Sequence, residues 1–257
     1  EPLASSNAVL NHEEKEAGVA LIDIGGGTTD LAIFKDGIIR HTAVIPFGGN
    51  VITEDIKEGC SIIEKQAELL KVKFGSAWPG ENRENEIVSI PGLRGRDPKE
   101  ISLKNLSKII HARTVEIIEQ VYLEIKNYGH EDQKKKLIAG IVLTGGGSQL
   151  KHLKQLVEYV TGMDTRVGYP NEHLAGDTDK SVTSPLYATA VGLLMDGLDK
   201  VDQISSTEKV EDKNNESDNL EVLEDNESPK EIKNKIQRES FLDKLTEKVK
   251  DFLDNAE

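Results

Sequence analysis

Eight residues near the start of the chain, Asp23-Ile24-Gly25-Gly26-Gly27-Thr28-Thr29-Asp30, restrict its fold more than any other stretch. An apolar run, residues 19–22, leads into this octet, and a second, residues 31–34, leaves it. Two short β-type runs joined by three glycines predict a tight hairpin. Because glycine reaches positive φ without a Cβ clash, we expect the turn to direct its N–H groups outward as an anion-binding nest.

Phosphate is the usual occupant of such a nest, and the octet favours it here. Asp23 stands at the end of the first strand, where its carboxylate could hold a hydrated Mg2+ beside the phosphate. The alternative is a glycine-rich hairpin with two solvated aspartates, Asp23 and Asp30, and no ligand at all.

A second glycine-rich turn, Thr144-Gly145-Gly146-Gly147-Ser148, follows residues 137–143, which have the composition of a fully buried strand. Apolar residues with helical spacing begin at Leu150. We expect a helix start close to the turn, with free N–H groups and the positive end of its dipole. A close helix–strand packing turn would have the same sequence, but two such turns in one domain favour a shared ligand site.

The residues between and after these turns alternate short strands and helices. Residues 19–46 predict three consecutive antiparallel strands. Ser61, with Glu64 three residues later, predicts the capped start of a helix. Ser184 and Pro185 predict the first residues of a final helix.

Glu68 and Lys71 fall on one face of the helix that follows Ser61, at i and i+3. They could form an exposed ion pair of little energetic value, or they could point at a ligand. Spacing alone favours the exposed pair.

Composition excludes several classes of protein. The net charge of −14 argues against a nucleic-acid partner, because phosphate backbones require clustered cations. The single cysteine, Cys60, excludes a disulfide within the chain and fits a reducing compartment. No apolar run is long enough to span a membrane. The chain starts at Glu1 without Met, inside an apparent helix, so we expect a preceding part of the natural protein to be missing.

The last quarter of the chain differs in character. Residues 200–231 hold eleven acids, four lysines and no aromatic residue, which predicts a disordered, self-repelling linker. Residues 240–253 then show a helical period whose apolar face needs a membrane surface or a partner protein. With four bases against five acids over residues 238–254, anionic lipid is not strongly favoured, and both occupants stay open. The apolar face consists of Phe241, Leu242, Leu245, Val249, Phe252 and Leu253.

Taken together, these motifs resemble the actin-like ATPase superfamily and, within it, the FtsA family of bacterial cell division proteins. The octet resembles the second phosphate loop, and residues 142–148 resemble the adenosine loop. Residues 1–5, 47–56 and 185–193 also resemble this family, as does the order of domain, acidic linker and amphipathic helix. The five motifs occur in the family's order.

The resemblance implies an α/β fold: an actin-like ATPase (ribonuclease H-like) domain with a small α/β subdomain inserted, followed by a disordered linker and an amphipathic helix. Residues 1–46 and 136–198 would form the large subdomain on the nucleotide side. The small subdomain would be residues 47–135. The acidic linker would be residues 199–231, and residues 232–257 the membrane-targeting helix.

The resemblance also implies ATP and Mg2+ as cofactors. The helix that carries Glu68 and Lys71 touches adenosine in the superfamily, which reverses the preference for an exposed pair. The implied residues are Asp23 and Glu1 for Mg2+ and its water, Gly25, Gly26, Gly27, Thr28 and Thr29 for the β- and γ-phosphates, and Glu68, Lys71, Gly145, Gly146, Gly147 and Ser148 for adenosine.

No first phosphate loop, first domain or inserted assembly domain of the family precedes these motifs. The chain is therefore expected to contain half a nucleotide site and to bind ATP weakly or not at all by itself.

FtsA-like proteins tether the tubulin-like protein FtsZ to the inner membrane, so the implied location is its cytoplasmic face at the division site. The implied partners are the FtsZ C-terminal tail, a second copy in a head-to-tail filament, the membrane surface and other division proteins. An acidic, apolar tail requires cations beside an apolar groove, here on residues 47–135. The available cations are Arg94, Arg96, Lys99, Lys104, Lys108 and Arg113. The candidates chosen from them are Arg94, Arg96, Lys99 and Arg113, of which Arg113 is preferred because a helix would hold it rigidly.

The resemblance implies an ATP-binding scaffold that is at most a weak ATPase. Two alternatives share the fold: an actin-like adaptor of pilus assembly, which would not be expected to carry the linker and final helix, and a sugar-kinase-like enzyme, which would need a substrate pocket and a catalytic base.

Overall fold

A computed structural model describes residues 2–83, 85–92, 97–170 and 182–201 of the 257-residue chain. Glu1, Arg94, Arg96, the linker after residue 201 and the apolar face of residues 241–253 lie outside the described residues.

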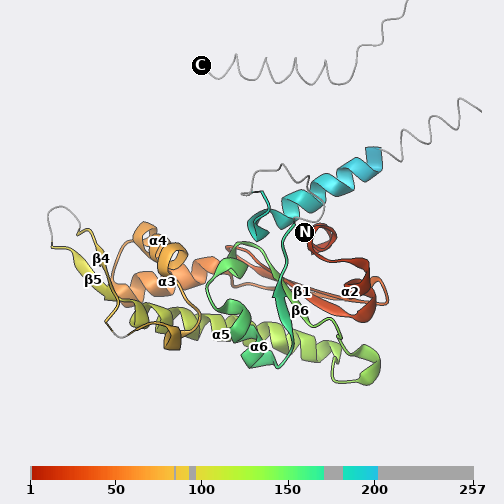
Figure 1. Cartoon of the computed structure of the whole chain (residues 1–257), viewed down its shortest axis with the longest axis horizontal. Coiled ribbons are helices and arrows are strands. Elements are labelled where there is room, and N and C mark those ends of the chain that lie inside the picture. The colour runs from red at the N-terminus through yellow and green to blue at the C-terminus, as the bar shows by residue number, and fades with distance from the viewer. Residues whose placement is uncertain (1, 84, 93–96, 171–181, 202–257) are drawn as a thin grey trace, which may run out of the picture. The chain divides into compact units, whose positions relative to one another are not determined.

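A five-stranded mixed sheet in the order β3-β2-β1-β6-β7 forms the centre of the fold (Figure 1). The antiparallel strands β1 (Val19–Ile24), β2 (Thr29–Lys35) and β3 (Ile38–Ile45) follow one another in the chain, which confirms the three strands predicted there. The strands β6 (Ile141–Thr144) and β7 (Thr165–Val167) extend the sheet parallel to β1. β6 is buried throughout, which explains its unbroken apolar sequence.

Helices cover both faces of this sheet. On one face, Ala20, Ile22 and Ile24 of β1 pack in a cluster with α5 (Leu103–Tyr128) and α6 (Leu153–Thr161). On the other face, Val19 and Leu21 pack in a cluster with α1 (Pro2–Val9) and with the helical residues 188–201. The division follows from the period of two along a strand, which sends successive side chains to opposite faces.

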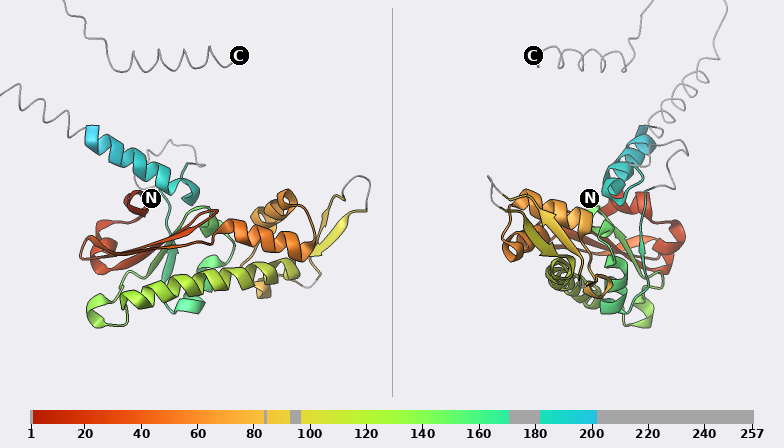
Figure 2. Two further views of the ribbon diagram at one scale, coloured as in Figure 1. Left: turned by 180° about the vertical axis from the view of Figure 1, so that it is seen from behind. Right: turned by 60° about the vertical axis from the view of Figure 1, so that its left-hand side comes forward.

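A second, two-stranded sheet of β4 (Ile87–Ile90) and β5 (Lys99–Ser102) lies apart from the first. With α3 (Gly49–Cys60), α4 (Glu64–Phe74) and the first half of α5, it encloses a third apolar cluster. Figure 2 shows α5, coloured yellow-green, running alongside both parts. Because α5 contributes to both cores, the boundaries of a small subdomain at residues 47 and 135 stay a prediction.

The remaining described elements are short. The helix α2 (His12–Ala17) precedes β1, and the 3-10 turns are η1 (Pro79–Glu81), η2 (Gln133–Lys135), η3 (Gly146–Gln149) and η4 (Pro185–Tyr187). No helix among the described residues combines the length and apolar character that crossing a membrane requires.

Two predicted helix starts have different outcomes. Ser184 is confirmed as an N-cap: its side chain accepts a hydrogen bond from the N–H of Leu186, although a 3-10 turn precedes the helix. The prediction for Ser61 is wrong. Ser61 has a φ of 49° and ends α3, because its N–H turns back to the last carbonyls of that helix. α4 begins at Glu64 after an N-cap at Ile63 that forms no side-chain bond.

Glu14 ties α2 to the far edge of the sheet. It completes a capping box with Asn11, and its two carboxylate oxygens each accept a hydrogen bond of 2.7 Å from Arg166 on β7. Arg166 also donates to the carbonyl of Val9 at 2.8 Å. Burial opposes the charge on Glu14, but the hydrogen bonds from Arg166 and Asn11 outweigh it and lower the pKa of this carboxyl.

We expect Glu14→Gln to lower the free energy of unfolding by about 1–2 kcal/mol at neutral pH, since it removes a charge-assisted pair. Glu13→Gln, on the exposed neighbour, is the matched control and should change little. Because folding lowers the pKa of Glu14 below its ordinary 4.5, its stabilisation is present above that pH and lost below it. Urea unfolding should therefore show the difference between wild type and Glu14→Gln narrowing in acid; a difference that grows in acid would contradict this account.

Candidate functional site

The two glycine-rich turns meet at one edge of the central sheet. β1 and β6 are parallel neighbours, with Asp23 opposite Thr144 at their carboxyl ends. The turn of residues 25–28 leaves β1 at this edge, and the turn that starts at Gly145 leaves β6 beside it. In open α/β sheets, ligands bind outside the carboxyl ends of parallel strands, so the topology alone makes this edge a candidate site.

The carbonyls of the first turn are held by the start of α3. Gly49 donates its N–H to the carbonyl of Gly25 at 2.9 Å, and Asn50 donates to the carbonyl of Gly26 at 2.8 Å. The approach is close, because a Cβ on Gly48 would lie 2.6 Å from the oxygen of Gly25. The carbonyl groups of Gly25 and Gly26 therefore face α3 and are already hydrogen-bonded.

The donor side of the same turn is open. Within the part of the chain that the structure describes, the N–H groups of Gly26, Gly27 and Thr28 form no hydrogen bond, and all three residues are exposed. A Cβ on Gly27 would meet nothing within 4 Å. Three adjacent N–H groups in exposed residues, without a hydrogen bond to the described residues, can receive an anion.

We expected positive φ angles at the glycines to shape the first turn, and this is not what the structure shows. None of Gly25, Gly26 and Gly27 has a φ in the left-handed region, so the prediction of positive φ is wrong for this turn. The contacts with α3 hold the turn instead, and a Cβ on Gly26 would lie 3.2 Å from the side-chain oxygen of Asn50.

Asp23 is half-buried at the end of β1, and its Oδ2 accepts a hydrogen bond of 3.2 Å from the hydroxyl of Thr189. No group of three or more metal-binding side chains gathers among the described residues. A single carboxylate beside phosphate donors nevertheless suits Mg2+, which keeps most of its waters and binds phosphate oxygens directly.

The two threonines of the octet differ. The hydroxyl of Thr28 is exposed and donates to Asp30 at 3.0 Å. The side chain of Thr29 is fully buried in the sheet, where its hydroxyl donates to the carbonyl of Phe47 at 2.8 Å. The buried hydroxyl of Thr29 therefore holds the strand in place and is turned away from solvent.

The second turn packs directly on the first strand. Gly145 has a φ of +79°, and a Cβ there would overlap Asp23 Oδ1 and lie 2.6 Å from the oxygen of Ile24. Its N–H donates to the carbonyl of Pro185 at 3.2 Å, which brings the segment before residue 188 to the site.

The predicted order of strand, glycine-rich turn and helix is confirmed, but a 3-10 turn separates the glycines from the helix. Gly146 begins the 3-10 turn η3, and α6 begins only at Leu153. The N–H of Ser148 donates to the carbonyl of Gly145 at 3.2 Å and its hydroxyl does so at 2.7 Å. The tight turn uses donors that a helix start would have left free.

Glu68 and Lys71 form the predicted i,i+3 ion pair at 2.8 Å, but the pair is not simply exposed. The side chain of Lys71 is only 14% exposed, and its Nζ also contacts the start of α3, at the carbonyl of Gly49 and the hydroxyl of Thr53. Burial raises the pKa of Glu68, but hydrogen bonds from Lys71 and Thr53 lower it by more.

Three residues that contact this edge, Thr189, Pro185 and Asn50, were not predicted as site residues from the sequence. Pro185 was noted as a helix start and Thr189 only within a segment that resembles the family, as was Asn50. Each contacts the site through a hydrogen bond between segments far apart in the chain, which spacing cannot reveal.

The described cations predicted to bind a partner already have contacts. Arg113 on α5 donates to both oxygens of Asp55 at 2.6 and 3.0 Å, and to Glu116 at 2.6 Å. Lys99 on β5 donates to the carbonyl of Ser61 at 3.4 Å.

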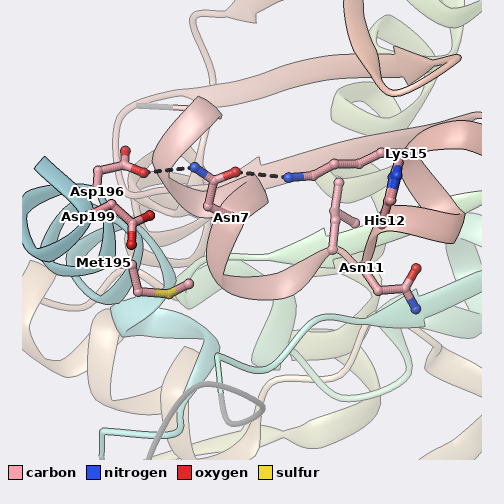
Figure 3. Close-up of a pocket in the computed structure, with 8 residues that line it drawn as sticks. Asn7, Asn11, His12, Lys15, Met195, Asp196 and Asp199 are labelled. Atoms are coloured by element: carbon pink, nitrogen blue, oxygen red, sulfur yellow. Dashed lines mark hydrogen bonds between the residues drawn. The ribbon is translucent and has the colours of Figure 1, made fainter. Parts of the chain in front are cut away.

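A cavity of about 440 Å3 lies elsewhere, among α1, α2 and the helical residues 188–201 (Figure 3). A chain of hydrogen bonds runs along it, from Lys15 to Asn7 at 2.9 Å and from Asn7 to Asp196 at 2.8 Å. Burial lowers the pKa of Lys15, partly opposed by the charge of Asp196. No residue predicted to contact nucleotide lines this cavity.

Solved structures with the same arrangement define the class of fold. The crystal structure of MreB5 of Spiroplasma citri bound to ADP matches with a TM-score of 0.59 and 23% identity over 75% of this chain and 56% of that chain. The PilM–PilN type IV pilus biogenesis complex matches with a TM-score of 0.58 and 19% identity over 76% of this chain and 51% of that chain. The chain therefore has the actin-like fold.

Sequence comparison identifies the family. A family model described as cell division protein FtsA matches residues 20–192. Cell division protein FtsA of Pseudomonas aeruginosa is 42% identical over 200 residues, which cover 78% of this chain and 47% of that protein. FtsA of Escherichia coli K12 is 39% identical over 196 residues, 75% of this chain and 46% of that protein. The chain belongs to the FtsA family, and it spans about half the length of the curated relatives it matches.

Close packing of the two turns predicts an unequal effect of two similar substitutions. Gly145→Ala should cost about 2–4 kcal/mol of unfolding free energy, because left-handed strain adds to the overlap with Asp23 and Ile24. Gly162→Ala, at a φ of +68° with nothing within 4 Å, meets only the strain and should cost about 1–2 kcal/mol. Urea unfolding of both variants measures the difference, and equal losses would contradict the close packing.

Proposed function

We propose that the edge formed by the two glycine-rich turns binds the phosphates of Mg-ATP, and that the chain is the nucleotide-responsive part of a division scaffold. The observation that carries this proposal is that Gly26, Gly27 and Thr28, near the carboxylate of Asp23, are exposed and that their N–H groups form no hydrogen bond to the described residues. Two solved structures of this fold, MreB5 bound to ADP and MreB5 bound to AMPPNP, support a nucleotide as the ligand.

Different segments at this edge would contact different parts of Mg-ATP. Residues 25–28 would surround the β- and γ-phosphates, and Thr29 would hold the turn in the sheet. Asp23, with Glu1, would hold Mg2+ through water, and the metal would neutralise phosphate charge. Residues 145–148 would pack on the adenosine side. Glu68, which is 47% exposed, is the candidate polar contact there.

We propose a scaffold with at most weak ATPase activity rather than a kinase. The predicted amphipathic helix after an acidic linker has no use in a small-molecule kinase, but it suits a protein that must lie at the membrane. The family supports a role at the division site, and we place the chain on the cytoplasmic face of the inner membrane.

FtsZ would bind on the part of the chain between residues 47 and 135, through its acidic C-terminal tail. Lys99 and Arg113 supply described cations there, with Arg94 and Arg96 between them in sequence. The tail's carboxylates would replace Asp55 or Glu116 as the partners of Arg113. Other division proteins and a second copy in a head-to-tail filament complete the proposed partners.

The nucleotide site predicts weak but localised binding. We expect Mg-ATP to shift the amide signals of Gly26, Gly27 and Thr28 with a dissociation constant of about 1 mM or weaker, because the chain spans about half of its relatives. Asp23→Asn should remove the gain in affinity that Mg2+ provides over EDTA. Asp36→Asn, in the exposed β2–β3 turn, is the control and should retain that gain. Shifts confined to the cavity around Lys15, or an unchanged Mg2+ effect in Asp23→Asn, would contradict the assignment.

The membrane role predicts that residues 238–257 are needed for lipid binding. Co-sedimentation with phosphatidylethanolamine–phosphatidylglycerol vesicles should be lost on their deletion, and Leu245→Gln should weaken it. Glu247→Gln changes the opposite face of the predicted helix and should preserve binding. Equal sedimentation with and without residues 238–257 would argue for a protein partner or another lipid-binding surface.

A further inference from the structure

All three N–H donors of the Lys71 ammonium group have an acceptor within the protein. It lies 2.8 Å from the carbonyl oxygen of Gly49, 2.7 Å from the hydroxyl of Thr53 and 2.8 Å from the carboxylate of Glu68. A lysine ammonium has three N–H donors, and three acceptors are in place. No donor is left for a ligand while these contacts persist.

The carbonyl that Lys71 holds belongs to a residue in contact with the first glycine-rich turn. Gly49 donates its own N–H to the carbonyl of Gly25 at 2.9 Å, and Asn50 donates to that of Gly26 at 2.8 Å. Lys71 is therefore connected to the turn through a single residue.

These two bonds determine which side of the turn is open. In a trans peptide the N–H group points away from the carbonyl of the preceding residue. Since the carbonyls of Gly25 and Gly26 are directed at α3, the N–H groups of Gly26 and Gly27 point away from α3. If the first turn of α3 moved, the carbonyls would lose their donors and the turn would lose its fixed orientation.

The network around Lys71 is suited to fixing the start of α3. Thr53 is 4% exposed, and its hydroxyl contacts Glu68 at 2.5 Å as well as Lys71. Glu68 neutralises the ammonium, so the buried charge is paired as well as hydrogen-bonded. Three side chains from two helices thus lock α4 to the first turn of α3.

We propose that Lys71 is a positioning residue: it acts through Gly49 to hold the first glycine-rich turn open toward phosphate. The proposal rests on the phosphate site proposed above, but its structural part concerns the turn without ligand. It also links α4, which packs in the third apolar cluster, to the nucleotide edge. A partner that displaces α4 would change phosphate affinity, and phosphate would change the affinity for that partner by the same factor.

The first test uses the chain without nucleotide. Lys71→Met keeps the length of the side chain but removes its donors, and we expect the amide signals of Gly26, Gly27 and Thr28 to shift or broaden. Lys73→Met, on the exposed side of the same helix, is the matched control and should leave them unchanged. Unchanged signals in Lys71→Met would overturn the proposal, whether or not the chain binds ATP.

The second test separates positioning from direct contact, with tripolyphosphate and adenosine as separate probes in the full chain. Lys71→Met should weaken tripolyphosphate binding about tenfold, or 1.4 kcal/mol, and unchanged tripolyphosphate binding would overturn the positioning role. Weaker adenosine binding with unchanged tripolyphosphate binding would assign Lys71 to the adenosine contact and overturn the proposal.

A milder variant protects the test against misfolding. Thr53→Val removes one acceptor of Lys71 with little change of shape, and it also removes the bond of 3.1 Å from the Thr53 hydroxyl to the carbonyl of Gly49. It should reproduce part of the loss of tripolyphosphate affinity. Thr53→Ser keeps the hydroxyl and should restore that affinity. If Thr53→Val and Thr53→Ser were equally affected, the hydroxyl would not be part of the mechanism. If the chain bound neither probe, the phosphate site would fail while the amide test still decided the role of Lys71.

Discussion

The parallel pairing of β1 with β6 is the constraint on which the rest of this structure depends. It places Asp23 opposite Thr144, so both glycine-rich turns leave the sheet at the same edge. The segment around Pro185 and Thr189 then closes on that edge through the N–H of Gly145 and the carboxylate of Asp23. Residues separated by more than 100 positions in the chain become one site because a parallel strand pair brings its carboxyl ends together.

The start of α3 supplies the second constraint. A glycine-rich turn by itself has many conformations, since glycine loses more conformational freedom on folding than any other residue. Here Gly49 and Asn50 take two of its carbonyls, and Lys71 holds Gly49 in turn. The open donor side of the turn is therefore a property of helix packing more than of the glycines. This explains how a site on the large sheet could respond to events on α4.

Sequence reasoning succeeded where the evidence was local. The three strands of residues 19–46, the cap at Ser184 and the family itself could all be predicted from patterns and motifs. It failed at Ser61 and at the φ of residues 25–27, because a neighbouring element decided each one. It also did not foresee the 3-10 turn between Gly145 and α6. Ser61, for instance, has the composition of a cap but ends α3 in a left-handed conformation.

The sequence by itself determined the alternation of strands and helices, the two glycine-rich turns and membership of the FtsA family, since these follow from period, turn chemistry and motif order. Only the tertiary structure decided which groups are free to act. The donors of Lys71 are consumed and Arg113 is paired, whereas Gly26, Gly27 and Thr28 keep exposed N–H groups. The physical reason is that a donor's availability depends on acceptors brought in by packing, which residue type and spacing along the chain do not record.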